Sequence, residues 1–362
     1  MLNNYRPTWL EINLKNLVYN YQYLSDKIGT KTAIPVVKAN AYGHGSIEVV
    51  RSLMKIGVNV FAVSLLEEAI ELRNEFKDIE ILALGTVLPN QIELASKYNI
   101  TITIYSYQFG LEILNSSTPI KTHLKVDTGM NRLGIKSRDE IISLVKSFND
   151  HPQHQLEGIF THFATADNNE KFFFHQLDRF KSLMSEINPK PKIVHLSNSS
   201  SMVKYENDID FSSHTRLGIS LYGLSLERNA DYLKPVMKLK TKIVQFKELE
   251  PGEFVGYGIT YKAVRHERIG IIPIGYADGL IRKNNPGYVE INGKTYPIIG
   301  RICMDYTFIL VDENITYDDE VIVMGGSIVS IDEIANRLDT ISYEIITLIS
   351  KRVPRIYIGK ED

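Results

Sequence analysis

The segment Ala33-Ile34-Pro35-Val36-Val37-Lys38 is a short, mostly β-branched apolar run that ends in a charged residue. Similar runs recur along the first two thirds of the chain, at residues 58–63, 79–84, 100–105, 120–126, 156–161, 192–196 and 217–222. The stretches between them carry apolar residues at helical spacing, as in Phe173, Leu177, Phe180 and Met184. Eight strands that alternate with helices are typical of an α/β protein, so we expect an N-terminal (β/α)8 barrel of the TIM type over residues 1–225.

The pattern changes in the last third of the chain, where short strands are separated by turn residues. The alternating run 288–291 leads into Asn292-Gly293, a dipeptide that favours a hairpin. One helix is expected at 330–338, because two acidic residues fall in its first turn. We therefore expect a C-terminal, mainly-β domain over residues 226–362, which the N-terminal strand of the chain is able to join.

The composition favours a small molecule as the partner. The 362 residues include 41 Lys and Arg against 43 Asp and Glu, and the net charge of -2 gives no field that favours nucleic acid or an anionic membrane. Cys303 is the single cysteine, which excludes a disulfide framework and a cysteine zinc site. The N-terminus lacks a signal-peptide core, and no apolar run has the length of a membrane span. We expect a cytoplasmic protein with no metal, nucleic acid or membrane as its partner.

The active site of such a barrel lies at the C-terminal ends of its strands, so the polar residues that follow the apolar runs are the candidates. They are Lys38, Lys125, Asp127, His162, Ser197, Asn198, Ser199 and Arg216. Lys38 leaves a buried strand, and burial would lower the pKa of its amine and prepare it to bond to a carbonyl carbon. The alternative is a lysine whose stem covers the barrel rim while its amine stays in water.

A phosphate group is expected near the loops that follow the seventh and eighth strands, where barrels commonly bind one. Asn198-Ser199-Ser200-Ser201 and Gly218-Ile219 offer hydroxyls and backbone N–H groups there. The alternative is a serine-rich loop with an ordinary helix cap. A reactive lysine and a phosphate site on one face of a barrel together suggest pyridoxal phosphate (PLP).

The segment 37–45, Val-Lys-Ala-Asn-Ala-Tyr-Gly-His-Gly, resembles the lysine motif of the bacterial alanine racemases, which are PLP enzymes of fold type III. Further motifs match in the family's order, at 125–134, 161–164, 198–199, 216–219, 221–223, 256–258, 274–279, 300–305 and 342–344. The resemblance covers nearly the whole chain. It implies an amino-acid racemase (an isomerase) that interconverts L-alanine and D-alanine, with D-alanine for peptidoglycan, or L-alanine where D-alanine is catabolised, as the physiological output.

The resemblance also implies a homodimer in which each barrel receives the β domain of the other chain. Racemisation removes a proton from one face of a carbon and returns one to the opposite face, so it needs two acid/base groups. Lys38, which would hold PLP, is one of them, and Tyr257 of the partner subunit is the other. His162 and Arg216 would stabilise the phenolate of Tyr257. Without the motif at 256–258, an ordinary tyrosine at the edge of a strand is a plausible alternative for Tyr257.

Three cationic residues have implied roles around the cofactor. Arg216 would face the pyridine nitrogen of PLP and, as a group that only donates, leave that nitrogen unprotonated, although a structural ion pair is the alternative. Arg132 would bind the phenolic oxygen of PLP and the substrate carboxylate. Lys125 is often carbamylated in this family, which would turn it into an anion that orients Arg132. An ordinary lysine paired with Asp127 is the alternative.

The remaining implied contacts surround the cofactor and the substrate. Besides Asn198 from the seventh loop, the contacts expected near the phosphate are Tyr42, Ser199, Gly218, Ile219 and Tyr343. Met304 and Tyr276 would narrow the substrate entrance from the partner's side, although Met304 is also a plausible core filler.

Other classes remain open at this point. Fold type III decarboxylases share the architecture, but they carry an acidic partner for the pyridine nitrogen where this chain has Arg216. Single-barrel PLP-binding proteins share the lysine strand, but they lack a β domain. Racemases of broader or serine specificity are the nearest alternatives.

Overall fold

The computed structural model describes residues 5–225 and 232–360. They belong to two compact units, which we describe separately. The first, called the barrel unit below, comprises Leu17–Ala41 and Ser46–Lys234. The second, called the β unit, comprises Met1–Asn16, Tyr42–Gly45 and Pro235–Asp362.

Eight parallel strands form the sheet of the barrel unit, in the order β2-β9-β8-β7-β6-β5-β4-β3. A parallel bridge between Val36 and Ala62, in which the N–H of Val37 donates to the carbonyl of Ala62 at 2.8 Å, joins the two ends of this order and closes the barrel. The predicted (β/α)8 barrel is confirmed. The strands are β2 (Thr32–Pro35), β3 (Val60–Val63), β4 (Glu80–Ala83), β5 (Thr101–Ile104), β6 (Lys121–Lys125), β7 (Gln155–Phe160), β8 (Ile193–His195) and β9 (His214–Leu217).

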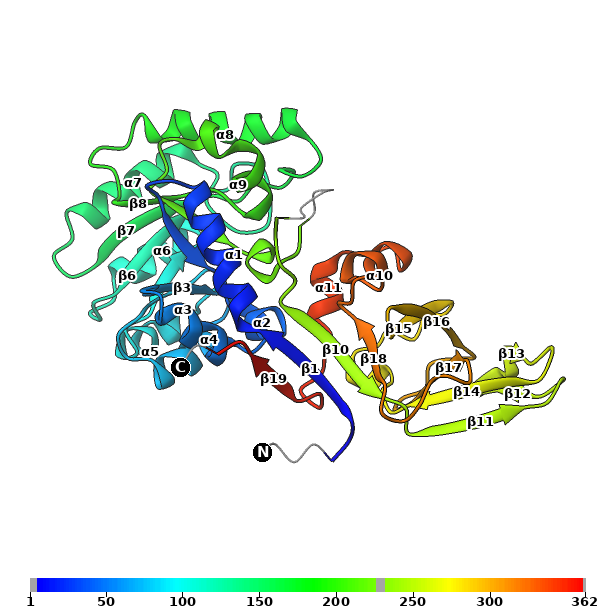
Figure 1. The fold of residues 1–362 in the computed structure, drawn as a ribbon. Coiled ribbons are helices and arrows are strands. Elements are labelled where there is room, and N and C mark those ends of the chain that lie inside the picture. The colour runs from blue at the N-terminus through cyan, green and yellow to red at the C-terminus, as the bar shows by residue number, and fades with distance from the viewer. Residues whose placement is uncertain (1–4, 226–231, 361–362) are drawn as a thin grey trace. The chain divides into compact units, whose positions relative to one another are not determined.

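Helices alternate with these strands, and Figure 1 shows α7 and α8 outside the sheet. The four residues predicted to form one apolar face, Phe173, Leu177, Phe180 and Met184, are all buried in α8. The helices are α1 (Leu14–Lys27), α2 (Lys38–Tyr42), α3 (Ser46–Met54), α4 (Leu66–Glu75), α5 (Ile92–Lys97), α6 (Tyr107–Leu114), α7 (Arg138–Asn149), α8 (Glu170–Met184) and α9 (Ser199–Tyr205).

The eighth strand was predicted at the wrong place. The apolar run 217–222 is mostly a 3-10 helix, η3 (Ile219–Tyr222), and the strand is the more polar segment His214–Leu217 before it. The run reads as a strand because all of η3 is buried and apolar apart from Ser220. The true strand reads as polar because Thr215 and Arg216 are buried inside the protein. Arg216 therefore lies within β9 and not beside it.

A nine-stranded sheet forms the main body of the β unit, in the order β11-β14-β17-β16-β15-β18-β10-β1-β19. The N-terminal strand lies in this sheet, antiparallel to β10 and parallel to β19. The strands are β1 (Thr8–Asn13), β10 (Met237–Lys242), β11 (Gln245–Leu249), β14 (Glu267–Ile272), β15 (Gly287–Ile291), β16 (Lys294–Ile299), β17 (Thr307–Val311), β18 (Glu320–Met324) and β19 (Arg355–Ile358), with β12 (Phe254–Val255) and β13 (Tyr261–Lys262) forming a separate pair.

The predicted hairpin and helix of this unit are present. Asn292 and Gly293, with φ of 50° and 74°, form the turn between β15 and β16. The hydroxyl of Ser330 accepts the N–H of Glu333 and caps α10 (Ile331–Arg337). A second helix, α11 (Ser342–Thr347), was not predicted because six residues are too few for a periodic pattern. Among the residues that the structure describes, no helix is long and apolar enough to cross a membrane.

Candidate active site

Lys38 begins a turn with an unusual backbone. Helix α2 begins shortly after the first barrel strand ends at Pro35, and its residues 39–42 have φ of 52°, 54°, 53° and 53°. The left-handed conformation costs a non-glycine residue about 1–2 kcal/mol, so four in succession persist only where neighbours hold them. Such strain is typical of functional sites.

Two hydrogen bonds from the barrel unit hold this turn. The backbone N–H of Ala39 donates to Oε1 of Glu68 in α4 at 2.5 Å. Oδ1 of Asn40 accepts the backbone N–H of Ser46, at the start of α3, at 3.0 Å. Glu68 was not among the predicted residues. The sequence does not set Glu68 apart, because an acidic residue in the first turn of a helix is common.

Lys38 is half-buried, and the pKa of its amine is lowered. Burial is the largest cause, followed by the positive charge of Arg132, and Arg216 adds to it. The carboxylate of Glu68 opposes the shift. The direction agrees with the sequence prediction: the neutral, nucleophilic amine is more abundant than in an exposed lysine.

Arg216 is the most highly connected residue of the site. Its side chain is buried, with 4% of the residue exposed. It donates to the carbonyl oxygens of Thr161 (2.9 Å), His195 (2.8 Å) and Leu196 (2.9 Å). It also donates to Nδ1 of His195 at 2.6 Å and to Nδ1 of His162 at 3.3 Å. These partners are neutral acceptors, so the ion pair considered as an alternative is not what holds it.

The guanidinium group fixes the tautomers of the two histidines that it contacts. Because arginine only donates, Nδ1 of His195 and Nδ1 of His162 must accept, which leaves the proton of each ring on Nε2. Burial, and then the charge of Arg216, holds the pKa of both imidazoles well below the usual range. Burial lowers the pKa of Arg216 itself to about 9, so it remains charged at neutral pH. His162 therefore presents an Nε2–H donor.

The network continues from His195 to a further buried histidine. Nε2 of His195 donates to Nδ1 of His123 at 2.9 Å, and burial, then His214 and Arg216, lower the pKa of His123 to about 3. A Cβ atom added at Gly158 would lie 2.6 Å from that same Nδ1. Neither His195 nor His123 was predicted, because both fall within the apolar runs 192–196 and 120–126; in the structure His123 lies inside β6 and His195 is the last residue of β8.

Lys125 ends β6 and is also buried, with 6% of the residue exposed. The pKa of its amine falls from 10.5 to about 8, because of burial and then the charges of Arg132 and Arg216, while Asp127 opposes the shift. Oδ1 of Asp127 accepts the backbone N–H groups of Gly129 and Asn131 at 3.0 Å. The carboxylate that was considered as the partner of Lys125 is thus bonded to its own loop.

The two loops predicted to bind phosphate come together. The hydroxyl oxygen of Ser199 accepts the N–H groups of Gly218 at 3.1 Å and Ser220 at 3.3 Å, and it keeps its own proton to donate. Asn198 caps α9, since its Oδ1 accepts the N–H of Ser201 at 3.0 Å. Asn198 is therefore an ordinary helix cap, which was the alternative considered for this serine-rich loop.

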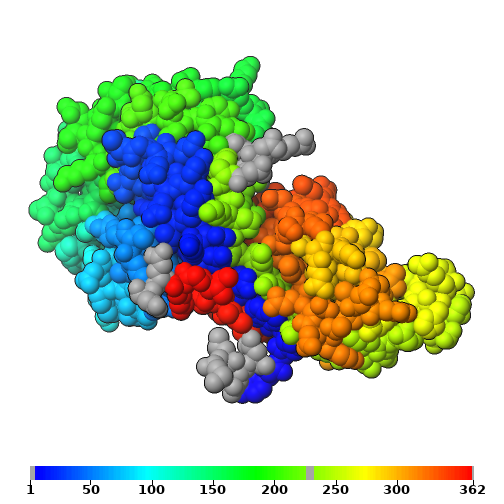
Figure 2. Space-filling model, in the orientation of Figure 1, coloured from blue at the N-terminus to red at the C-terminus, as the bar shows by residue number. Residues whose placement is uncertain are grey.

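The predicted residues of the β unit lie on its surface. Tyr257 is 70% exposed, in the short helix η4 (Tyr257–Ile259), between Gly256 and Gly258, which both have φ of 70°. Met304 is 52% exposed, so it is not a core filler, and Tyr276 is exposed as well. Residues of this region appear in yellow and orange in Figure 2.

Tyr343 differs from these residues because it lies against another predicted contact. Its ring centroid is 5.9 Å from that of Tyr42, which is buried. Both residues belong to the β unit, although they are 301 positions apart in the chain.

Two models of known protein families together match most of this chain. The alanine racemase N-terminal domain matches residues 12–226, and the alanine racemase C-terminal domain matches residues 236–357. The chain belongs to the alanine racemase family. The resemblance inferred from the motifs is confirmed, and membership makes this chain an enzyme of the racemase class.

Relatives and solved structures in the alanine racemase family match over almost their full length. An alanine racemase of Listeria monocytogenes serotype 4b (strain F2365) is 40% identical over 98% of both chains, and one of Anoxybacillus flavithermus is 37% identical over 98% of this chain and 95% of its own. The crystal structure of alanine racemase from E. faecalis matches with a TM-score of 0.92 and 35% identity, over 99% of this chain and 100% of that one. A histidine racemase from Leuconostoc mesenteroides matches with a TM-score of 0.90 and 26% identity, over 98% and 99%.

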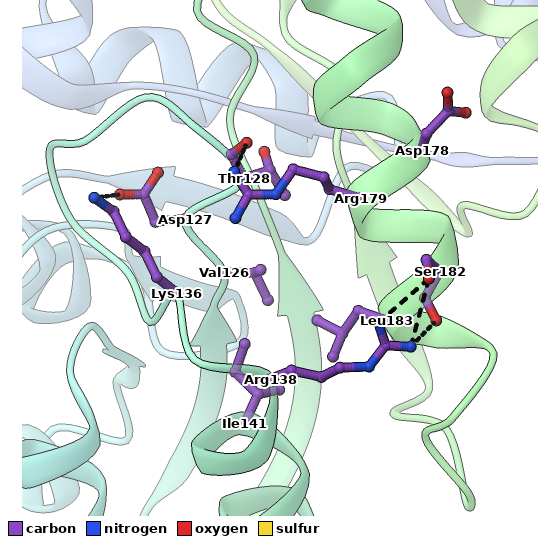
Figure 3. Close-up of a pocket in the computed structure, with 10 residues that line it drawn as sticks. All are labelled: Val126, Asp127, Thr128, Lys136, Arg138, Ile141, Asp178, Arg179, Ser182 and Leu183. Carbon is purple, nitrogen blue, oxygen red and sulfur yellow. Dashed lines mark hydrogen bonds and ion pairs between the residues drawn. The ribbon is translucent and has the colours of Figure 1, made fainter.

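A separate cavity of about 360 Å³ lies in the barrel unit (Figure 3). Its lining comes from α7, α8 and the segment after β6. In Figure 3 Lys136 points toward Asp127, and Arg138 toward Ser182. Of the candidate residues Asp127 lines it, whereas Lys38, Lys125, His162 and Arg216 do not. The candidate racemase site is therefore the group of residues around Lys38 and not this cavity.

Proposed function

We propose that this protein interconverts L-alanine and D-alanine with PLP, as a homodimer that combines Lys38 of one chain with Tyr257 of the partner subunit. The observation that carries the proposal is the group of four cations Lys38, Lys125, Arg132 and Arg216, whose mutual repulsion contributes to the lowered pKa of both lysines. Such a group is stabilised by an anionic ligand and keeps one amine reactive.

The residues present fit PLP. The cations suit its phosphate, its phenolic oxygen and the carboxylate of an amino acid. The hydroxyl of Ser199 is anchored between the N–H groups of Gly218 and Ser220, beside the backbone of Ile219 in η3. We assign the phosphate to Tyr42, Asn198, Ser199, Gly218, Ile219 and Tyr343, with Lys38 as the residue that holds the cofactor.

The chain's own groups would handle the proton. PLP, when bound, supplies an electron sink for the negative charge left on the substrate Cα once its proton is removed. Lys38 accepts a proton at Nζ on one face of Cα, and Tyr257 of the partner subunit delivers one from its Oη on the other face. The reverse direction exchanges these two roles.

Arg216 and His162 would set the electrostatics of these steps. Arg216 is held by three carbonyls and the imidazole of His195, and as a group that only donates it would face the pyridine nitrogen and leave that nitrogen without a proton. His162, with its proton on Nε2, offers a hydrogen bond to the phenolate of Tyr257 and stabilises that base.

Arg132 and Lys125 would hold the carboxylate of the substrate. Arg132 is exposed, yet it acts by charge on both Lys38 and Lys125. The amine of Lys125, with a pKa of about 8, is suited to carbamylation. The carbamate would change a cation that repels Arg132 into an anion that orients it.

The surface of the β unit supports the proposed dimer. Tyr257, Ile259, Tyr276, Met304 and Tyr306 are each more than 40% exposed. An apolar and aromatic group of this kind is typical of a protein interface. We propose that these residues meet the barrel mouth of the partner and that Met304 and Tyr276 restrict its entrance to small side chains. The single thiol, Cys303, suits the cytoplasm, where D-alanine would supply peptidoglycan.

A wider substrate range is the second candidate. The likeness to a histidine racemase, with a TM-score of 0.90, indicates that this fold accepts other side chains. Rates measured side by side for L-alanine, L-serine and L-histidine separate the two candidates. Alanine specificity predicts that alanine is preferred over serine by at least about tenfold, since one polar atom in an apolar pocket is worth ~1–3 kcal/mol.

The test of the mechanism follows chirality and Cα deuteration of L-alanine in deuterated water with PLP, for the wild type, Lys38→Ala, Tyr257→Phe and the control Tyr288→Phe. Tyr288 is another exposed tyrosine of the β unit. We expect deuterated D-alanine from the wild type and the control, and a loss of conversion of at least about a thousandfold in the other two variants. Full conversion by Tyr257→Phe would remove the two-base assignment.

A further inference from the structure

The backbone around Lys38 needs an anchor that the proposed mechanism does not yet contain. The four residues after Lys38 all have left-handed φ, although none of them is glycine. The amine of Lys38 can be directed at one place only if the residue next to it is fixed. What fixes Ala39 therefore matters for the position of the amine.

Glu68 links that residue to the start of a neighbouring helix. Its Oε1 accepts the N–H of Ala39 at 2.5 Å, while its Oε2 accepts the N–H groups of Ser64 at 2.9 Å and Leu65 at 3.1 Å. Each oxygen thus serves a different segment. A glutamine has one acceptor oxygen and would present an amide N–H to the other segment, so only a carboxylate satisfies both.

The charge of Glu68 also acts on the same amine. It raises the pKa of Lys38 against burial and against the charges of Arg132 and Arg216. Lys125 is a further cation that interacts with Lys38. At the amine of Lys38, the charge of Glu68 thus opposes the charges of the surrounding cations, and the same carboxylate also holds the turn through a hydrogen bond.

We propose that Glu68 is a positioning residue for Lys38: it holds the left-handed turn through the N–H of Ala39 and balances the cations around the amine. The proposal rests on the proposed function for the role of Lys38 as a base. The position of the turn, however, can be measured without any racemisation.

The first measurement is backbone hydrogen exchange at residues 38–42 of the full-length protein, without substrate. We expect Glu68→Ala to speed exchange of the Ala39 amide at least about tenfold, because the acceptor is lost. The matched control is Glu67→Ala, which removes an exposed acidic residue from the same first turn of α4. It is expected to leave that amide unchanged.

The second measurement is the pH dependence of acylation of Lys38 by an amine-reactive reagent, followed by peptide mass spectrometry on cofactor-free protein. Glu68→Gln removes the charge and keeps one acceptor, so the midpoint should move to lower pH, with roughly threefold to tenfold more neutral amine near pH 7. Glu68→Asp keeps the charge and should retain the wild-type midpoint. A purely structural role would not separate these two variants.

The possible outcomes distinguish the positioning role of Glu68 from the proposed racemase function. If Glu68→Ala exchanges the Ala39 amide like Glu67→Ala and Glu68→Gln titrates like the wild type, the positioning role is wrong. If these shifts appear but the wild type does not racemise alanine, the anchor stands and the proposed function fails. If Glu68→Ala does not fold, shown by lost cooperative unfolding, the comparison of Glu68→Gln with Glu68→Asp still tests the action of the Glu68 charge on Lys38.

Discussion

The candidate residues of the barrel unit and of the β unit are held in opposite ways. Arg216, Lys125 and Ser199 are buried and bonded or packed within their own unit. Tyr257 and Met304 stand 70% and 52% exposed. The barrel side is preorganised by the chain that carries it, whereas the β side presents exposed groups, as the proposed dimer requires. The difference teaches that stability and activity should respond separately to changes in the two units.

The largest change in stability is expected inside the barrel. Arg216→Ala leaves three buried carbonyls and two imidazoles without their donor. The free energy of unfolding should fall by about 4 kcal/mol in urea titration. The control Arg132→Ala removes an exposed arginine from the same group of cations and should cost less than about 1 kcal/mol. Equal losses would show that burial does not distinguish them.

Lys125 should bind carbon dioxide as a carbamate. A pKa of about 8 against an ordinary 10.5 gives roughly three hundred times more neutral amine at pH 7. The neutral amine and bicarbonate form the carbamate and water, so at fixed 13C-bicarbonate the carbamate signal in NMR should grow as the pH rises through about 8 and then level off. Lys125→Ala should abolish the signal and Lys136→Ala should keep it. A signal that survives Lys125→Ala contradicts the assignment.

Gly158→Ala should cost an intermediate amount. The new Cβ would meet Nδ1 of His123, the atom that accepts the hydrogen bond of His195, at 2.6 Å. Overpacking of this kind costs about 1–3 kcal/mol, measured as the change in the free energy of unfolding. In a His123→Ala background the same change should cost much less, because the clash is gone. Equal costs in both backgrounds would remove His123 as the reason for this glycine.

Tyr257→Phe should have the smallest effect on stability. Its ring is mostly exposed, so the free energy of unfolding should change by no more than about 0.5 kcal/mol, even though activity is lost. Thermal and urea unfolding of the purified variant test this. A loss above about 1 kcal/mol would mean that Tyr257 is stabilised by contacts within its own chain.

The sequence was sufficient to predict the architecture and to select candidate residues at strand ends, because the spacing of apolar residues and the position of a polar residue after a strand are local features. The barrel and the loop around Ser199 and Gly218 were predicted in this way. It could not find Glu68, because the bond to Ala39 joins segments 29 residues apart. It missed His123 and His195 because strand interiors were read as apolar, and it displaced the eighth strand for the same reason: Thr215 and Arg216 are polar but buried.

The central claim is that one active site takes Lys38 and Tyr257 from different chains, and mixing two inactive variants tests it most directly. Lys38→Ala and Tyr257→Phe subunits are denatured together, refolded with PLP and assayed for racemisation of L-alanine. A shared site predicts that mixed dimers contain one site with both residues intact, which restores about a quarter of wild-type activity in an equal mixture. If the mixture stays as inactive as either variant alone while mixed dimers form, the two residues do not come from different chains and the account is wrong.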